Sequence, residues 1–594
     1  MAPRLKEHAW AFAVALGIGL LFGLPNIFFA VSLGSEYRGI PLLQTPNEDS
    51  YLARIQEVTD GHGALGSPFL FEYKDEPPLS PPTGEWLYAL PSVLFGVSPA
   101  ATLIGSKFLL PAILFLLIYA LIFRLTGGEG RPRALTALAG GMLTVLGYDL
   151  IDYRTVFEYL AGDESPGAFL LWARPVNPIL GALFLFSFLL IIWSLAERRE
   201  KPVVRLGGAG VFLALMFGSY FFSWGMALSV LAALVLTLLV RGEYKTAGML
   251  SLIVPVGALF SSPYWFFAWR AAKSPWYEGS VLRSGLFLTH YPLLNKLLLV
   301  ALVLYALVLF YDFYLKKRTG SAFVWEGWHS FVLAFLLGGV WAYSQQMLTG
   351  RTIWPYHFVQ YTIPLAMVSG VVVLHRIIRA RSIYVWGTFV SAALAASLAF
   401  GVYTQVVAYT KARPHAVHLQ TYAPLFAWLN RGEKDCVVFV NETNEEMMEL
   451  NTLIPAFTHC NRYTTTELLS LLPAERAVHG YLSLLRLRGI SPEGIDAYLA
   501  AARSEAAGYL YADWKGLFGV KDFPDVRDTV LEQRLQEFPA LYRAFAARDF
   551  RAELRRYRLD YILSNGPLEE RVARELRGLE KVFEASGKVL YAVD

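Results

Sequence analysis

The chain has 594 residues, of which 55% are hydrophobic and 17% are charged, and its mean hydropathy is +0.41. Soluble globular proteins carry about a quarter charged residues, so this composition excludes an ordinary soluble protein and indicates a membrane protein. The net charge of +4 is small for this length and gives no indication of nucleic-acid binding.

Eleven apolar segments have the length of membrane-spanning helices, which need about 20 apolar residues. They cover residues 8–32, 99–123, 134–150, 178–196, 206–221, 223–240, 247–265, 293–315, 322–343, 357–375 and 383–408. The first segment follows Arg4 and Lys6 and lacks a small-residue cleavage site. We therefore expect it to be an uncleaved anchor rather than a signal peptide.

Basic residues are concentrated in every second loop. These are Arg124, Arg131, Arg133, Arg198, Arg199, Lys201, Arg205, Arg241, Lys245, Lys316, Lys317, Arg318, Arg376, Arg379 and Arg381. The positive-inside rule then predicts a cytoplasmic amino terminus. The odd number of spans puts the carboxyl terminus outside the cytoplasm, as expected for a multi-pass protein of the plasma (inner) membrane.

The first external loop, residues 34–98, is the first long polar interval, and it contains Glu48, Asp49 and Arg54. A carboxylate beside lipid and aromatic surface is desolvated, which raises its pKa towards the range useful for a general base. A guanidinium can hold two phosphate oxygens at once. We predict acid/base chemistry on an anionic substrate here. The alternative is a loop helix that Asp49 caps, with Arg54 and Glu57 solvated.

The second external loop follows Asp149 and Asp152, which are spaced i, i+3 and can share a helix face. Such a pair could bind a hard divalent cation such as Mg²⁺ or Mn²⁺. A polar helix end at the membrane interface is the alternative, because a strict DxD motif is missing. The sequence predicts no other cofactor.

Two later external loops carry basic residues, although the positive-inside rule makes such residues uncommon on the external face. They are Arg270, Lys273 and Arg283 in one loop and Arg351 in the other, where His357 follows. These residues predict an anionic partner, for which a lipid phosphate is the natural candidate. Ordinary headgroup contact is the alternative for each cation, and a structural hydrogen bond is the alternative for His357.

From residue 409 to 594 the pattern is that of a soluble extracytoplasmic α/β domain. Asp435–Asn441 reads as a buried strand, and Tyr557–Ser564 and Lys581–Val593 read as two closing strands. Helical patterns cover Leu468–Leu487, Pro492–Ala507 and Asp528–Arg558.

The only two cysteines, Cys436 and Cys460, lie in this domain. Outside the cytoplasm a disulfide between them is permitted. Buried free thiols are the alternative, because Cys436 heads an apolar strand. With no nearby pair of histidines, the two cysteines do not indicate a zinc site.

Two stretches of the first loop resemble a known family. NEDSYLAR (Asn47–Arg54) has an acidic start, and DEPPLSPPTGEWLYALPSVLFG (Asp75–Gly96) is a proline- and aromatic-rich exit. Together with the span layout they resemble the GT-C superfamily of membrane glycosyltransferases, which includes protein O-mannosyltransferases, aminoarabinose transferases and oligosaccharyltransferase catalytic subunits.

The resemblance implies that Asp49, or Glu48 beside it, is the catalytic base. It also implies inverting transfer of a sugar from a polyprenyl-phosphate donor to a lipid, glycan or protein acceptor of the cell envelope. A strict DxD in the second loop and a WWD-type acceptor motif are missing, which disfavours oligosaccharide transfer to asparagine. Lipid-monophosphate donors fit better, with external Arg and Lys residues neutralising the leaving phosphate.

Two other classes of function compete with this interpretation. A transporter would place ionisable residues near mid-membrane and show paired broken helices, whereas here Lys107 is one of few charges within a predicted span. A non-catalytic protein that binds a lipid-linked glycan would tolerate loss of Asp49.

Overall fold

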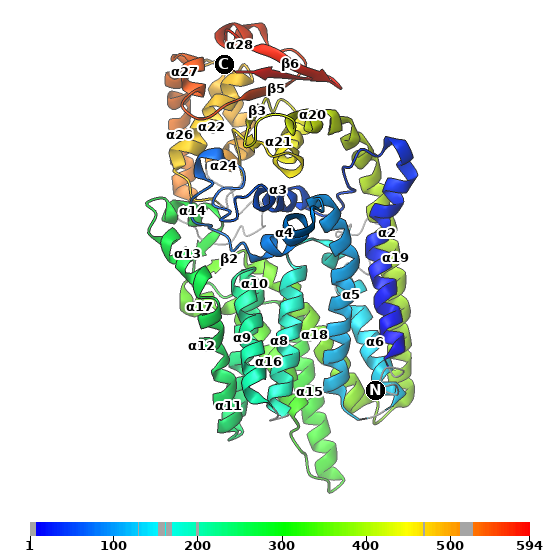
Figure 1. Cartoon of the computed structure of the whole chain (residues 1–594). Helices are drawn as coiled ribbons and strands as arrows, with labels where there is room; N and C mark the ends of the chain where they lie inside the picture. The colour runs from blue at the N-terminus through cyan, green and yellow to red at the C-terminus, as the bar shows by residue number, and fades with distance from the viewer. Residues whose placement is uncertain are drawn as a thin grey trace.

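The computed structural model describes residues 8–128, 130–151, 161, 169–197, 201–466, 470–510 and 527–593. A long helical bundle carries a smaller sheet-containing domain on one end (Figure 1). The chain begins at the opposite end of the bundle and finishes in the sheet domain. The predicted fold class is confirmed: this is a polytopic α-helical membrane protein with a C-terminal α/β domain.

Each of the eleven predicted spans corresponds to a helix or a set of broken helices. They are α2 (Ala9–Leu33), α5 (Pro99–Thr126), α6 (Arg131–Leu146), α8 (Ile179–Glu197), α9 (Pro202–Phe217), α10 (Phe221–Val240), the series α11 (Tyr244–Ser251), α12 (Ile253–Phe260) and α13 (Ser262–Ala272), α15 (Lys296–Arg318), α16 (Gly327–Ser344), α18 (Val359–Val373) and α19 (Ile383–Leu419).

Fewer of these helices than predicted meet the length and composition of a full span. Within the described ranges eight do so, or nine if Tyr244–Phe260 and Ser262–Ala272, which are bent by 63°, form one span. Helices α6 and α9 have 16 residues each. Because 16 residues rise only about 24 Å, these two are shorter than the hydrocarbon core.

Small residues let the bundle helices approach closely. Gly338 of α16 lies against the backbone of α10, where an added Cβ would come within 2.8 Å of the Val230 Cα. Close backbone contact of this kind is how helices associate in lipid, which offers no hydrophobic driving force between them. The close packing of the helices fixes the positions at which the loops at each end of the bundle begin and end.

The basic loops gather at the end of the bundle where the chain begins. His8, just before α2, contacts Tyr119 in the second half of α5. Arg376 donates to the Leu125 carbonyl near the end of α5. The loops that the charge pattern assigns to the cytoplasm and the first loop therefore lie at opposite ends of the bundle. Which end faces the cytoplasm stays a prediction.

The C-terminal domain is built on a five-stranded sheet of order β4-β3-β5-β7-β6. Its strands are β3 (Val437–Val440), β4 (Asn461–Arg462), β5 (Tyr561–Asn565), β6 (Glu580–Ala585) and β7 (Lys588–Ala592). β3 runs parallel to β4 and β5, and β7 runs antiparallel to β5 and β6. Residues 581–593, expected as one strand, form a hairpin instead, because Ser586 and Gly587 make a turn with φ of 51° and 73°.

Helices surround this sheet. They are α20 (Ala423–Leu429), α21 (Glu445–Phe457), α22 (Ala474–Leu487), α23 (Ile495–Ala501), α24 (Arg503–Leu510), α26 (Arg527–Ala546), α27 (Phe550–Leu554) and α28 (Glu570–Glu575). The bundle leads into the domain through α19, which continues past residue 409 to Leu419.

The first external loop lies between the bundle and the sheet domain (Figure 1). It contains α3 (Glu48–Thr59) and α4 (Thr83–Phe95). Leu52 and Ala53 of α3 pack with Leu103 of α5 on one side and Ala456 of α21 on the other. Beside the loop, α14 (Tyr277–Arg283) precedes β1 (Leu286–Leu288). β1 pairs antiparallel with β2 (Arg351–Ile353), and the sequence analysis did not predict this two-stranded sheet.

Candidate functional site

The amino-terminal turn of α3 is held by the carboxylate of Glu48. Its Oε1 accepts hydrogen bonds from the Thr45 amide at 2.8 Å and from the Thr45 hydroxyl at 2.6 Å. Lys107 Nζ of α5 lies 2.7 Å from Oε2, and both side chains are at most 1% exposed. The charge of Lys107 within a predicted span is thus matched by Glu48, and the oxygens of Glu48 are occupied.

Asp49 lies next to Glu48 but in a different environment. Its side chain is half-buried and forms no hydrogen bond or ion pair with any residue that the structure describes. At about 100° per residue, Asp49 shares its helix face with Ala53 and Gln56. Tyr51 and Arg54 point nearly the opposite way. Of the two predicted catalytic carboxylates, Asp49 is the one with unoccupied oxygens.

Arg54 is buried on the other side of α3. Its Nε donates to Glu85 Oε1 of α4 at 2.6 Å, and both side chains are at most 4% exposed. Its Nη1 is buried and has no hydrogen-bond partner among the described atoms. The guanidinium is therefore held in place by one carboxylate and still has a donor free for an anion.

A cation that the sequence analysis did not single out lies beside Tyr51. Arg174 follows η4 (Leu171–Ala173), and its guanidinium carbon is 5.7 Å from the centroid of the Tyr51 ring. It is half-buried, its Nε is buried without a partner, and no carboxylate in the described ranges contacts it. Applying the external-cation rule to WARPVNP, Trp172–Pro178, would have found it.

Burial raises the pKa of the Tyr51 hydroxyl, and the Arg174 guanidinium acts in the opposite direction. The hydroxyl therefore stays protonated near neutral pH and can donate a hydrogen bond. His357, which stacks on Phe222 with ring centroids 5.2 Å apart, is within electrostatic range of Arg174. Tyr51, Arg54, Arg174 and His357 thus belong to one region at the loop end of the bundle.

The other predicted external cations do not converge on this region. Arg270 and Lys273 are exposed on or after α13, with Lys273 Nζ 3.7 Å from the centroid of the Trp269 ring. Arg351 is exposed on β2. Arg283 is 5% exposed and lines a pocket with Arg476 of the C-terminal domain. Arg270 and Lys273 thus lie together at the end of α13, whereas Arg283 lies at the end of α14 and Arg351 lies on β2.

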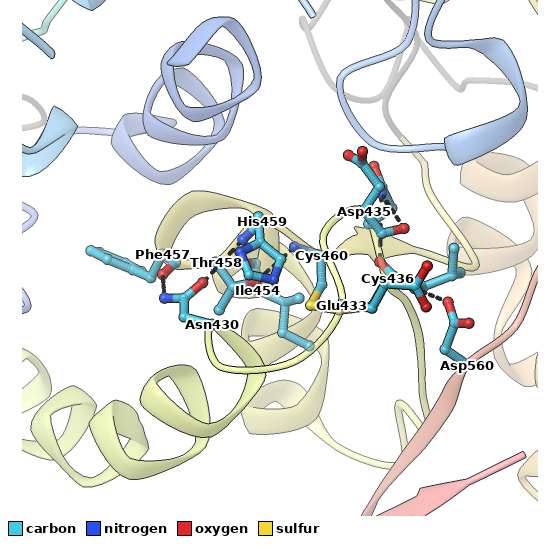
Figure 2. The surroundings of a disulfide bond; sticks show 12 residues. Asn430, Glu433, Asp435, Cys436, Ile454, Phe457, Thr458, His459, Cys460 and Asp560 are labelled. Atoms are coloured by element: carbon cyan, nitrogen blue, oxygen red, sulfur yellow. Dashed lines mark hydrogen bonds between the residues drawn. A yellow bond between two sulfur atoms is a disulfide. The ribbon is translucent and has the colours of Figure 1, made fainter. Parts of the chain in front are cut away.

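The predicted cation site comprises Asp149 and Asp152. Asp149 is half-buried in η3 (Tyr148–Ile151), whereas Asp152 lies outside the described residues. Cys436 and Cys460 form a disulfide, with His459 beside it (Figure 2). These three side chains bring ligand atoms within 4.8 Å of one another. Because both sulfurs are bonded to each other, the group does not form a cation site.

An apolar groove lies next to the exit of the first loop. Two adjoining pockets of about 350 and 280 Å³ share Pro78, Pro82, Trp86 and Phe267. The larger pocket is also lined by α9 and by the bend between α12 and α13. Nearly all of its surface is hydrocarbon, so it fits a chain rather than a headgroup.

No family model matches the chain, and no curated protein matches it. Among solved structures, the chain is similar to ArnT from Cupriavidus metallidurans in the apo state (12% identity, 96% of this chain and 97% of that chain, TM-score 0.43). It is also similar to an oligosaccharyltransferase from Archaeoglobus fulgidus (12% identity, 94% and 69%, TM-score 0.45). A third similar structure is ArnT from Cupriavidus metallidurans bound to undecaprenyl phosphate (11%, 96% and 98%, TM-score 0.42).

Proposed function

We propose that the chain is an inverting membrane glycosyltransferase that moves a sugar from a polyprenyl-phosphate donor to an acceptor outside the cytoplasm. The observation that carries the proposal is the environment of Arg174. It is a half-buried guanidinium with no carboxylate partner among the described residues, at the loop end of a membrane bundle. A phosphate of a membrane lipid supplies the charge and the acceptor oxygens that such a group needs.

The donor phosphate is proposed to bind between Arg174, the free Nη1 of Arg54 and the Tyr51 hydroxyl. Two guanidinium groups favour the negative charge that develops on the phosphate as the sugar leaves. The ion pair between Arg54 and Glu85 fixes one of them in advance, so little reorganisation accompanies the reaction. Arg270, Lys273 and Arg351 are proposed to contact lipid headgroups, and His357 to support the phosphate site. Arg283 lines a pocket with Arg476 of the C-terminal domain, and its predicted anionic partner is not assigned to the donor site.

Asp49 is proposed to act as the general base. It takes the proton from the acceptor hydroxyl as that oxygen bonds to the anomeric carbon, and the bond from this carbon to the phosphate oxygen breaks. Inversion requires the nucleophile and the leaving group on opposite sides of the reacting carbon. Asp49 and the phosphate-binding residues lie on opposite sides of α3, so we place the sugar across its amino-terminal turn.

The polyprenyl chain is proposed to lie in the apolar groove of Trp86 and Phe267. Each buried methylene contributes about 0.8 kcal/mol of favourable transfer free energy from water, although a chain leaving lipid gains less. The groove therefore sets where the donor lies more than how tightly it binds.

Turnover of a panel of polyprenyl-phosphate sugars by purified protein in lipid tests the proposal. Consumption by wild type that is lost in Arg174→Gln supports a phosphate site at Arg174. If the protein binds these lipids but turns none of them over with any acceptor tested, the result would instead favour the non-catalytic glycan-binding function.

A further inference from the structure

The carboxyl-terminal half of α3 is joined to the C-terminal domain through a group of charged side chains, of which Glu57 and Lys74 are buried and Asp435 is partly exposed. Lys74 Nζ lies 2.5 Å from Glu57 Oε2, and the two side chains are 4% and 6% exposed. The same Nζ is 3.6 Å from Asp435 Oδ1. His62 Nε2 lies 3.1 Å from that oxygen. A single carboxylate of the C-terminal domain thus contacts two residues of the first loop.

Asp435 is held firmly in its own domain. It lies two residues before the buried strand β3 and has a left-handed φ of 61°, which Asp and Asn tolerate better than most residues. Its amide donates to the His459 carbonyl at 3.2 Å, and its carbonyl accepts from Asn461 Nδ2 at 3.2 Å. Figure 2 shows it beside the disulfide between Cys436 and Cys460, which links the starts of β3 and β4.

The first loop also closes on itself at Lys74. A Cβ at Gly66 would lie 2.8 Å from the Lys74 carbonyl oxygen and 2.2 Å from that of Glu76. Only glycine allows so close an approach of two backbone segments. The backbone position of Lys74 is therefore fixed before its side chain reaches Glu57 and Asp435.

Helix α3 is consequently held from both sides. The bundle holds its amino-terminal turn through Glu48 and Lys107, and the C-terminal domain holds the other end through Lys74 and Asp435. Apolar contact adds to this, because Ala456 of α21 packs on Leu52 and Ala53.

We propose that Asp435 is a positioning residue of the C-terminal domain: through Lys74 and His62 it fixes the orientation of α3, and with it Asp49 and Tyr51. This rests on the proposed function for the roles of Asp49 and Tyr51, whereas the restraint on α3 itself does not. The C-terminal domain then takes part in catalysis by setting the geometry of a site to which it contributes no reacting group.

The test compares Asp435→Asn with Glu433→Gln in the full-length protein in lipid. Both variants remove one carboxylate without changing side-chain size, and Asn also accepts the left-handed backbone. Glu433 is a matched control, because its side chain is 77% exposed and its ion pair with Arg558, at 3.6 Å, involves no residue of the first loop. His62→Gln is the second variant, and it tests the same contact from the loop side should Asp435→Asn not fold.

Amide hydrogen exchange of residues 48–75 and steady-state turnover are both measured. We expect exchange in this segment to be faster in Asp435→Asn and in His62→Gln, and unchanged in Glu433→Gln. We expect kcat to fall by at least about tenfold in Asp435→Asn and His62→Gln, and KM for the donor to change less than kcat, because Arg174 lies outside α3 and still binds the donor phosphate.

Unchanged exchange in both variants would overturn the restraint on α3. Faster exchange with unchanged turnover would overturn the positioning role. If wild type turns over no donor, the exchange result still decides whether Asp435 restrains α3, and the failure then belongs to the proposed function.

Discussion

Lys107 Nζ lies 2.7 Å from Glu48 Oε2, and both of these side chains are at most 1% exposed. The neighbouring Asp49 has no hydrogen-bond or ion-pair partner among the described residues. Adjacent carboxylates in one sequence motif thus have different environments. The buried pair joins a membrane helix to the helix that carries the proposed base. Glu48 thus holds this turn, whereas the neighbouring Asp49 is the residue proposed to react.

Lys107→Met is expected to destabilise the protein strongly. It leaves the Glu48 carboxylate buried without its counter-ion, and breaking such a pair typically costs about 3–5 kcal/mol. Thermal unfolding in detergent measures the effect. The double variant Glu48→Gln, Lys107→Met removes both charges and should lie closer to wild type. Equal loss in the single and double variants would show that the pair contributes packing rather than charge compensation.

Arg174→Gln is expected to reduce kcat/KM for the donor by about 10- to 100-fold, the range of one or two lost hydrogen bonds to a charged group. Arg270→Gln, a change of the same type at an exposed position on α13, should change it by less than about threefold. Steady-state kinetics with one donor provide the comparison. Similar losses at both positions would mean that general charge, not a phosphate site, determines donor use.

Phe267→Ala is expected to raise KM for long polyprenyl donors and leave short-chain donors unaffected. The side chain lines both parts of the apolar groove, so only a chain long enough to enter the groove loses contact. The neighbouring Phe266, which is 55% exposed, provides the control variant Phe266→Ala. A loss independent of chain length would place the polyprenyl chain elsewhere.

The stability contributed by Glu446 should depend on pH. Hydrogen bonds from Tyr422 and Lys588 lower the pKa of this carboxyl from 4.5 to about 2. Because the pKa is lower in the folded state, the stabilisation is fully present above about pH 4.5 and is lost as the pH falls towards 2. The melting temperature of Glu446→Gln should therefore lie below that of wild type at pH 6 and approach it at low pH. A constant difference over that range would contradict the assignment.

Hydropathy and charge were sufficient to predict the bundle, because the membrane restricts a spanning segment to a long apolar helix. The sequence also predicted β3, whose run of apolar residues between polar ones requires burial on both faces. Short helices such as α6 and the break before α13 were not distinguished from full spans. In both cases neighbouring helices supply contacts that segment length does not reveal.

The candidate site was predicted less completely than the fold. The acidic start of α3 drew attention to this segment, but which of Glu48 and Asp49 is occupied depends on Lys107, which lies 59 residues further along the chain. Arg174 lies in an external loop and could have been found there by the external-cation rule, but only the folded structure reveals that no carboxylate among the described residues pairs with it. The contacts of Asp435 with Lys74 and His62 cross more than 350 residues and have no local sequence signal.

The most direct measurement is turnover of polyprenyl-phosphate sugars by wild type, Asp49→Asn and Glu48→Gln, each checked for folding by its melting temperature. The proposed mechanism predicts that Asp49→Asn folds like wild type and loses at least about 100-fold in kcat, the usual contribution of a general base. Glu48→Gln should lower the melting temperature and reduce kcat less than Asp49→Asn does. Wild-type turnover in a folded Asp49→Asn variant would contradict the assignment of Asp49 and move the base elsewhere, with Asp149 the next carboxylate to test.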